Sequence, residues 1–296
     1  MTKPAVMNLM EEQFLQEKSR LVGLAYRMVG RWTEAEDLVQ DAFIRWKKTD
    51  AEVRNPRAYL TSVVTRLCLD HLKSATQKRE VYPGTWLPEP VPTPPADQDL
   101  LHRDSLRFAM LRLLQQLNPK ERAAFLLREV LEHEYQEIAE WLEESPQNCR
   151  QLVSRAKTHL STERTRFEAG RDRVEKLVTQ FLQCVRSGDA DGLKKLLRED
   201  VVVWSDAGGK APAAIHPIRG RDKVARFFLG LARKSKVVEA DLVELNGLPG
   251  LVTFDGEFRR ATLFEVREES IDAICIVSNP EKLSAIANLA GEGQSF

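Results

Sequence analysis

The stretch that decides the fold is LNPKERAAFLLREVLEHEYQEIAEWLEESPQNCRQLVSRAKTHL, residues 117–160. Apolar residues recur along it at helical spacing, which predicts helices over residues 119–130, 135–142 and 146–166. The second and third helices are separated by Glu143-Glu144-Ser145-Pro146. Because Ser145 can cap a helix and Pro146 can occupy its first position, this break predicts a helix-turn-helix.

The helix that begins at Pro146 has one apolar and one polar face. Val153, Ala156 and Leu160 are expected to point inward. The outward positions carry side chains that read base edges or hold phosphates in a major groove, namely Gln147, Asn148, Arg150, Gln151, Ser154, Arg155 and Lys157. Over residues 150–166 five basic residues stand against one acidic residue. This excess favours DNA binding over an ordinary helical hairpin with a solvated face.

Further helices are expected nearer the N-terminus, over residues 14–29, 34–48 and 57–74. Gly30 is expected to end the first, Thr33 to cap the second, and Pro56 to open the third. Residues 54–79 hold six basic residues and one acidic residue, with Tyr59 and His71 among them. Aromatic rings beside cations are typical of single-stranded DNA binding, although Tyr59 could equally belong to the core.

The helix over residues 34–48 carries an anionic face. Asp37, Gln40 and Asp41 share this face at i, i+3, i+4 spacing. The apolar positions Leu38, Ala42 and Trp46 share another face of the same helix. Within a half of the chain that binds DNA, such a face suits a basic protein partner better than it suits DNA.

Proline marks a boundary between the helical segments. Six of the 14 prolines fall within residues 82–95, YPGTWLPEPVPTPP. Proline lacks a backbone donor and excludes its predecessor from the helical region, so we expect an extended linker. Large apolar side chains such as Trp86 and Leu87 are unfavourable in a linker exposed to water, so both are expected to dock in an apolar pocket.

The pattern changes near Gly170. A helix over residues 174–185 and a short helix ending near Arg198 are followed by β-branched runs at residues 201–204, 242–245, 251–254, 262–266 and 271–277. These runs predict a curved antiparallel sheet. The fold class is therefore multidomain, with helical domains followed by an α+β domain.

Composition excludes several classes of protein. The 296 residues include 43% hydrophobic and 30% charged residues, with 44 basic against 44 acidic, so bulk positive charge cannot be the means of binding DNA. The four cysteines are far apart, the five histidines lack ligand spacing, and we expect no zinc site, no other metal, no cofactor and no disulfide framework. Without a signal peptide or a run of about 18 apolar residues, a soluble cytoplasmic protein with no membrane partner is expected.

Three segments taken in order resemble the extracytoplasmic-function (ECF) sigma factors, the initiation subunits of bacterial RNA polymerase. They are AEDLVQDAFIRWKK (35–48), NPRAYLTSVVTRLCLDHLKS (55–74) and the helix-turn-helix stretch 117–160. The resemblance implies sigma region 2 at residues 1–80, a proline-rich linker at 81–99, sigma region 4 at 100–168 and a further domain at 169–296. Its implied partners are promoter DNA and core polymerase, including the β′ clamp and the β flap. No catalysis is implied.

The same resemblance assigns roles to individual residues. Asp37, Gln40 and Asp41 would dock on the β′ clamp helices. The promoter −10 element would be recognised and melted by Tyr59, Ser62, Arg66 and Lys73, and residues 47–51 would accept a flipped base. The −35 element would be read by Asn148, Arg150, Gln151, Ser154, Arg155 and Lys157.

Other motifs resemble one group within this family, which carries a fused C-terminal domain similar to SnoaL and nuclear-transport-factor-2 proteins. They are Trp86-Leu-Pro-Glu-Pro90, Asp206-Ala-Gly-Gly-Lys210 and Asn279-Pro-Glu-Lys-Leu283. Ala207 replaces a glycine of the group's pattern. The resemblance implies control by intramolecular contacts rather than by a separate anti-sigma protein. The contact residues would be Trp86, Asp206, Lys210, Asn279, Pro280 and Lys282.

Two alternatives compete with the sigma interpretation. The first is a ligand-responsive helix-turn-helix regulator that binds duplex DNA alone, although such a protein needs neither the linker nor the acidic face. The second is a SnoaL-type isomerase or cyclase with a DNA-binding appendage. Its candidate acid–base residues would be Asp206, His216, Arg219 and Asp255.

Overall fold

The computed structural model describes residues 3–49, 53–80, 82–93, 107–164, 170–234 and 239–286. The chain forms two compact units. The first holds most of the helices up to residue 162, and the second holds residues 82–93, 107–109 and the whole α+β domain. No helix in the described ranges is long and apolar enough to cross a membrane.

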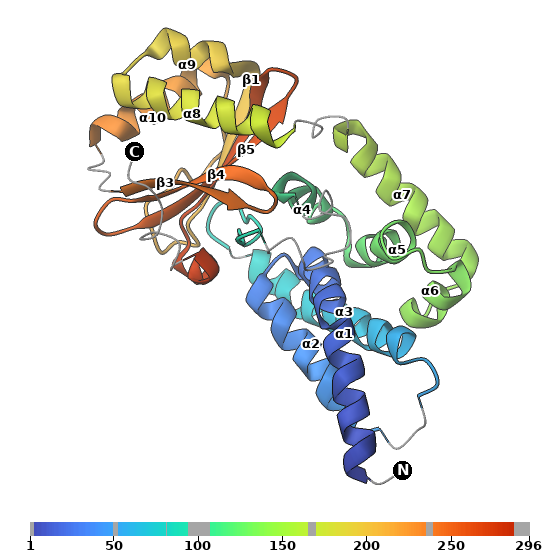
Figure 1. Cartoon of the computed structure of the whole chain (residues 1–296). Helices are drawn as coiled ribbons and strands as arrows, with labels where there is room; N and C mark the ends of the chain where they lie inside the picture. The colour runs from blue at the N-terminus through green and yellow to red at the C-terminus, as the bar shows by residue number, and fades with distance from the viewer. Residues whose placement is uncertain are drawn as a thin grey trace. The chain divides into compact units, whose positions relative to one another are not determined.

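Seven helices of the described chain precede the α+β domain (Figure 1). Their bounds are α1 Lys3–Val29, α2 Trp32–Lys47, α3 Pro56–Glu80, α4 Phe108–Leu114, α5 Pro119–Glu129, α6 Tyr135–Leu142 and α7 Pro146–Arg164. Gly30 ends α1 with a φ of +79°, and Pro56 opens α3, both as predicted.

The predicted cap of α2 is wrong. The helix begins at Trp32, and Arg31 precedes it in extended conformation without a side-chain cap. The Trp32 ring packs edge-on against Tyr26, with 5.3 Å between ring centroids. This tertiary contact favours a helix start one residue earlier than Thr33, because it holds the first turn of α2 against α1.

The helix-turn-helix has the predicted form. Glu143 ends α6 with left-handed backbone, and the Ser145 hydroxyl accepts a hydrogen bond of 3.1 Å from the Asn148 amide. Val153, Ala156 and Leu160 of α7 are buried. The helix interior and the cap were therefore predictable from local pattern alone.

The α+β domain places three helices over one face of a six-stranded sheet (Figure 1). The helices are α8 Arg171–Ser187, α9 Ala190–Leu196 and α10 Arg221–Lys234, and the strands are β1 Leu197–Asp206, β2 Ile218–Arg219, β3 Glu239–Leu245, β4 Leu248–Phe254, β5 Arg259–Arg267 and β6 Ser270–Val277. Two short 3-10 helices follow, η2 Pro280–Lys282 and η3 Ser284–Ile286.

The sheet is mixed rather than antiparallel as predicted. Its strand order is β2-β1-β6-β5-β4-β3, and β1 pairs in parallel with β6 while the other pairs are antiparallel. Strands that are neighbours in this order but far apart in sequence are joined by a crossover, and β1 and β6 are such a pair. The β-branched runs predicted β1, β3, β4, β5 and β6, but they could not reveal this pairing, and the sequence analysis missed β2 and α10.

Apolar residues cover both faces of this sheet. Between the helices and the sheet, Phe181 packs edge-on against Phe228 and Phe264. The other face carries a second cluster that includes Leu87 of the linker, Phe108 of α4, and Leu283 and Ile286 of the 3-10 helices. The domain therefore uses its second face to bind segments that lie outside the sheet.

Candidate functional site

The polar face of α7 is presented as the helical phase predicts. Arg150, Gln151, Ser154, Arg155 and Lys157 are all exposed. Asn148 differs, because it is half-buried and its amide donates a 2.7 Å hydrogen bond to the Glu144 carboxylate.

Neighbouring helices orient two of these cations. The Arg150 guanidinium lies over the Tyr135 ring, 5.0 Å from its centroid, and the Lys157 ammonium pairs with Glu129 at 2.7 Å. Both α7 side chains therefore start from defined positions rather than from free rotation.

The anionic face of α2 is also formed. Asp37, Gln40 and Asp41 are exposed, whereas Leu38 and Ala42 are buried against the rest of the unit. Ile44 extends the same face by one step of the helical spacing and is 40% exposed. An exposed apolar residue beside carboxylates is suited to a protein partner.

The polar face of α3 is only partly open. Tyr59 and Ser62 are half-buried, while Arg66 and Lys73 are exposed. Arg66 donates from Nη2 to the Glu140 carbonyl at 3.2 Å and from Nε to the Trp141 carbonyl at 3.4 Å. The arginine expected at the −10 element is thus engaged by α6 in this structure.

Of the predicted loop over residues 47–51, Asp50 and Ala51 lie outside the described residues. The Lys47 ammonium pairs with Glu11 at 2.6 Å.

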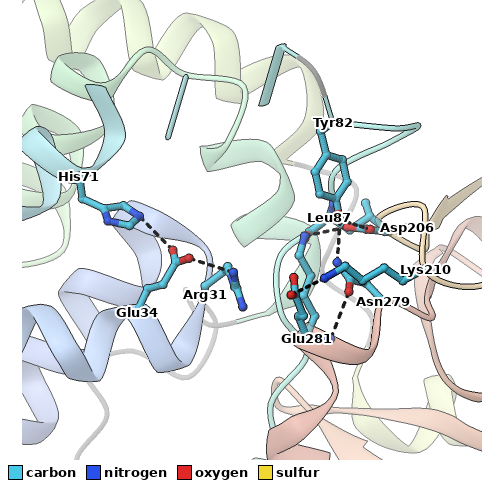
Figure 2. A network of polar contacts seen from close by, with 10 residues as sticks. Arg31, Glu34, His71, Tyr82, Leu87, Asp206, Lys210, Asn279 and Glu281 are labelled. Atoms are coloured by element: carbon cyan, nitrogen blue, oxygen red, sulfur yellow. Dashed lines mark hydrogen bonds and ion pairs between the residues drawn. The ribbon is translucent and has the colours of Figure 1, made fainter. Parts of the chain in front are cut away.

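His71 of α3 is held by the Glu34 carboxylate of α2. Its Nε2 lies 3.0 Å from the Glu34 carboxylate, which also accepts from Arg31 at 2.9 Å (Figure 2).

A buried arginine that sequence reasoning missed joins α5 to α1. Arg122 is 2% exposed, and its guanidinium donates to the Met28 carbonyl, to Gln115 Oε1 at 2.7 Å and to the Leu117 carbonyl at 3.1 Å. Arg27, which precedes Met28 in α1, is also buried, and burial lowers the pKa of Arg27 to about 10. Exposed basic residues are the norm, so the sequence offered no signal for this pair.

The linker is bound to the α+β domain through the Asp206 carboxylate, which is fully buried at the end of β1. Asp206 accepts from the Tyr82 hydroxyl at 2.5 Å and from the Leu87 amide at 2.7 Å (Figure 2). It also accepts from the Lys282 ammonium at 2.7 Å. Two of these three donors belong to the linker. We name the set of Tyr82, Trp86, Leu87, Asp206 and Lys282 the linker clamp.

Lys282 completes the clamp from η2. It is 1% exposed, and its ammonium donates to the Leu87 carbonyl at 2.6 Å as well as to Asp206. The same ammonium lies 4.0 Å from the centroid of the Trp86 ring and 5.2 Å from that of Tyr82. A desolvated cation facing aromatic rings is attracted by their quadrupoles. Leu87 is 1% exposed, which confirms the predicted docking of this residue. Trp86 differs from the prediction, because it is half-buried and its ring faces the Lys282 ammonium rather than an apolar pocket.

The remaining motif residues support the clamp. Asn279 donates from Nδ2 to the Tyr82 hydroxyl at 2.9 Å, and its Oδ1 caps η2, which opens with Pro280. Lys210 pairs with Glu281 at the surface. Positive φ is confined here to Gly208 and Gly209, so Ala207 fits its position without strain. A side chain at Gly208 would meet Asn279 and Tyr82.

The four residues of the isomerase alternative do not form a site. Asp206 is enclosed in the clamp, His216 and Arg219 are exposed, and Asp255 pairs with Arg260 at 2.6 Å. Asp255 follows β4, which lies three strands from β1 in the sheet, or roughly 14 Å at about 4.8 Å per strand. Among the residues that the structure describes, no group of His, Cys, Asp and Glu could hold a metal ion.

Comparison with known proteins decides the family. Residues 14–78 match the family of Sigma-70 region 2, and residues 107–160 match Sigma-70, region 4. The chain is 36% identical over 288 residues to the ECF RNA polymerase sigma factor SigJ of Mycobacterium tuberculosis, with 92% of each chain covered. This protein belongs to the ECF sigma factors.

Two further similarities support the same family. The crystal structure of M. tuberculosis SigJ superposes with a TM-score of 0.77 at 34% identity, covering 93% of this chain and 98% of that chain. A second M. tuberculosis sigma factor, SigI, is 36% identical over 64% of this chain and 67% of its own length. An ECF sigma factor directs RNA polymerase to promoters, so a regulator that acts on duplex DNA alone is not favoured.

Proposed function

We propose that three helices divide the work of initiation, and that the linker clamp controls it. In this scheme α2 binds core polymerase, α3 opens the −10 element and α7 binds the −35 element. The observation that carries the proposal is the contrast between the exposed polar faces of α2 and α7 and a linker whose Leu87 is buried against the sheet. The protein would act in the bacterial cytoplasm, where polymerase and promoter DNA meet.

Polymerase binding is assigned to Asp37, Gln40 and Asp41, with Ile44 at the edge of their face. All four are exposed at helical spacing, and the charge suits a basic partner such as the clamp helices of β′. The apolar residue supplies area that excludes water, while the carboxylates orient the complex.

Promoter DNA is assigned to α3 and α7. Tyr59, Ser62, Arg66 and Lys73 would hold the separated −10 strand by stacking and phosphate contacts. Since Arg66 donates to carbonyls of α6, binding at the −10 element requires that contact to break. The residues of α7 would read the −35 duplex, with Arg155 and Gln151 directed to base edges.

Regulation is assigned to the linker clamp. Residues 82–93 and Phe108 belong to the same compact unit as the sheet, so the described residues on either side of positions 94–106 are both held by the α+β domain. Polymerase needs the two regions on separate promoter elements. A clamped linker therefore competes with the extended form, and the fused domain replaces a separate anti-sigma protein.

A catalytic role is not proposed for the α+β domain. A cavity lined by Phe108, Val174, Leu245 and Phe264 has a volume of about 20 Å³, which is room for about one water molecule. Small-molecule sites need several hundred Å³. The aromatic cluster of Phe181, Phe228 and Phe264 fills the space beneath the helices instead.

Run-off transcription tests the division of work. Core polymerase with the full chain should give promoter-specific transcripts from the gene's own upstream region. Asp37→Ala/Asp41→Ala should lose polymerase binding, and Arg155→Ala should lose −35 binding, whereas the exposed substitution Lys176→Ala should change neither. Transcripts that are equal for all four proteins would refute the assignment, as would tight promoter binding by the chain without polymerase.

A further inference from the structure

Charge is unevenly distributed within the α+β domain. Residues 219–236 contain seven basic residues and one acidic residue, Asp222. The rest of residues 170–296 contains 12 basic and 18 acidic residues. The domain is therefore neutral in total, yet one short stretch is strongly basic and the remainder acidic. A cluster of like charges on one part of a surface attracts partners of the opposite charge.

The basic stretch forms one exposed face of α10. Val224, Ala225 and Phe228 are buried toward the sheet. At 100° per residue, the opposite side carries Lys223, Arg226, Arg233 and Lys234, all of which are exposed. Gly230 lies among them, and open space surrounds the position of its missing side chain. A bulky partner can therefore approach the helix backbone closely between the two pairs of cations.

The one carboxylate of this stretch already has a partner outside it. Asp222 forms a 2.7 Å ion pair with Lys194 of α9. The hydrogen bond from Lys194, together with the nearby charges of Arg226 and Arg221, lowers the pKa of Asp222. Because Lys194 balances Asp222, the surrounding field is that of the remaining basic residues.

Chain connectivity decides which polyanion this face can meet. The −35 helix α7 ends at Arg164, and α8 begins at Arg171. Seven residue steps span at most about 25 Å. With α7 in the major groove, the α+β domain must begin beside the duplex. The downstream side is taken by region 2 and polymerase in the function proposed above, which leaves DNA upstream of the −35 element.

We propose that the exposed face of α10 binds the phosphate backbone of duplex DNA directly upstream of the −35 element. The proposal rests on the assignment of α7 to that element. Contacts of this kind add affinity without sequence preference, and they make binding more dependent on salt. The fused domain would then have two tasks, since its sheet holds the linker and its α10 face holds DNA.

Promoter binding by the holoenzyme tests the proposal. Two labelled fragments from the gene's own upstream region are compared, one extending 40 base pairs above the −35 element and one ending at its upstream edge. The test variant is Arg226→Gln/Arg233→Gln. The matched control is Lys176→Gln/Arg186→Gln, which removes two exposed cations from α8.

On the long fragment the α10 variant should bind about tenfold more weakly at 0.1 M salt. The slope of log affinity against log salt should fall by about 2, or close to 0.9 for each lost phosphate contact. On the short fragment the variant and the parent should bind alike, and the control should match the parent on both.

Three results would overturn the proposal. Equal binding by the α10 variant and the parent on the long fragment would show that the α10 face does not bind upstream DNA. An equal loss on both fragments would point to polymerase instead. If the parent forms no promoter complex with core polymerase, the assignment of α7 itself fails, and this inference falls with it.

Discussion

The linker clamp and the α7 face both depend on basic side chains, but they use them in opposite ways. Lys282 is 1% exposed and its ammonium is saturated by a carboxylate, a carbonyl and two rings. Arg155 of α7 is exposed to solvent. Removing the partner of a buried charge strongly lowers stability. Removing an exposed charge changes stability little, and its effect is expected on ligand binding instead. The two regions should therefore respond to mutation in different assays.

The largest effect is expected from breaking the clamp. Lys282→Met leaves the Asp206 carboxylate buried without its cation, and should lower the free energy of unfolding by about 3–5 kcal/mol. Adding Asp206→Asn should recover part of this loss, because a neutral amide needs no counter-charge. Urea denaturation of the two variants measures both values. A loss below about 1 kcal/mol for Lys282→Met would show that the buried pair is not essential.

A smaller loss is expected at Arg122, a buried cation of the helical unit. Arg122→Met removes the donor to the Met28 and Leu117 carbonyls and should cost about 2–3 kcal/mol. Denaturation curves followed by circular dichroism would show the loss as a shift of the helical transition. Lys73→Met, which removes an exposed pair with Asp70, is the control and should shift the midpoint little. Equal shifts would contradict the difference between buried and exposed cations.

The α7 face should show the reverse behaviour. Arg155→Ala should leave the free energy of unfolding within about 0.5 kcal/mol of the parent. It should weaken −35 binding by about 1–3 kcal/mol, that is, roughly 5–150-fold. Fluorescence anisotropy with the holoenzyme measures DNA affinity, and a melting curve of the variant measures stability. A large stability loss without an effect on DNA would place Arg155 in the structure rather than at the promoter.

The smallest effect concerns pH and His133, in the turn before α6. Burial lowers the pKa of His133, and the charges of Arg20 and Arg57 add to this, while Glu137 opposes it. The folded state therefore binds fewer protons than the unfolded state near the ordinary histidine pKa of about 6.5. Stability should be full above that pH and decline as pH falls through it. Melting temperatures from pH 7.5 to 5.5 should fall less for His133→Gln; parallel curves would contradict this.

Sequence patterns predicted the exposed α7 face better than the buried linker clamp. Helical phase placed α7 and the α2 face, and Ser145 and Pro146 placed the turn before α7, because exposed amphipathic helices follow local rules. The docking of Leu87 was predictable from an apolar residue in a proline-rich linker. Pattern could not reveal that Asp206 accepts from Tyr82, or that Arg122 reaches Met28, since both join residues about 90 to 125 positions apart. The parallel pairing of β1 with β6 was missed for the same reason.

Run-off transcription by core polymerase tests most directly whether the clamp controls a sigma factor. Trp86→Ala removes the ring that faces Lys282, and Phe227→Ala truncates a half-buried aromatic on α10 as the matched control. The full chain should support promoter-specific transcripts. Trp86→Ala should raise their rate several-fold because the linker is released, while Phe227→Ala should not. An absence of promoter-specific transcripts with the parent, or an unchanged rate with Trp86→Ala, would contradict the proposed control.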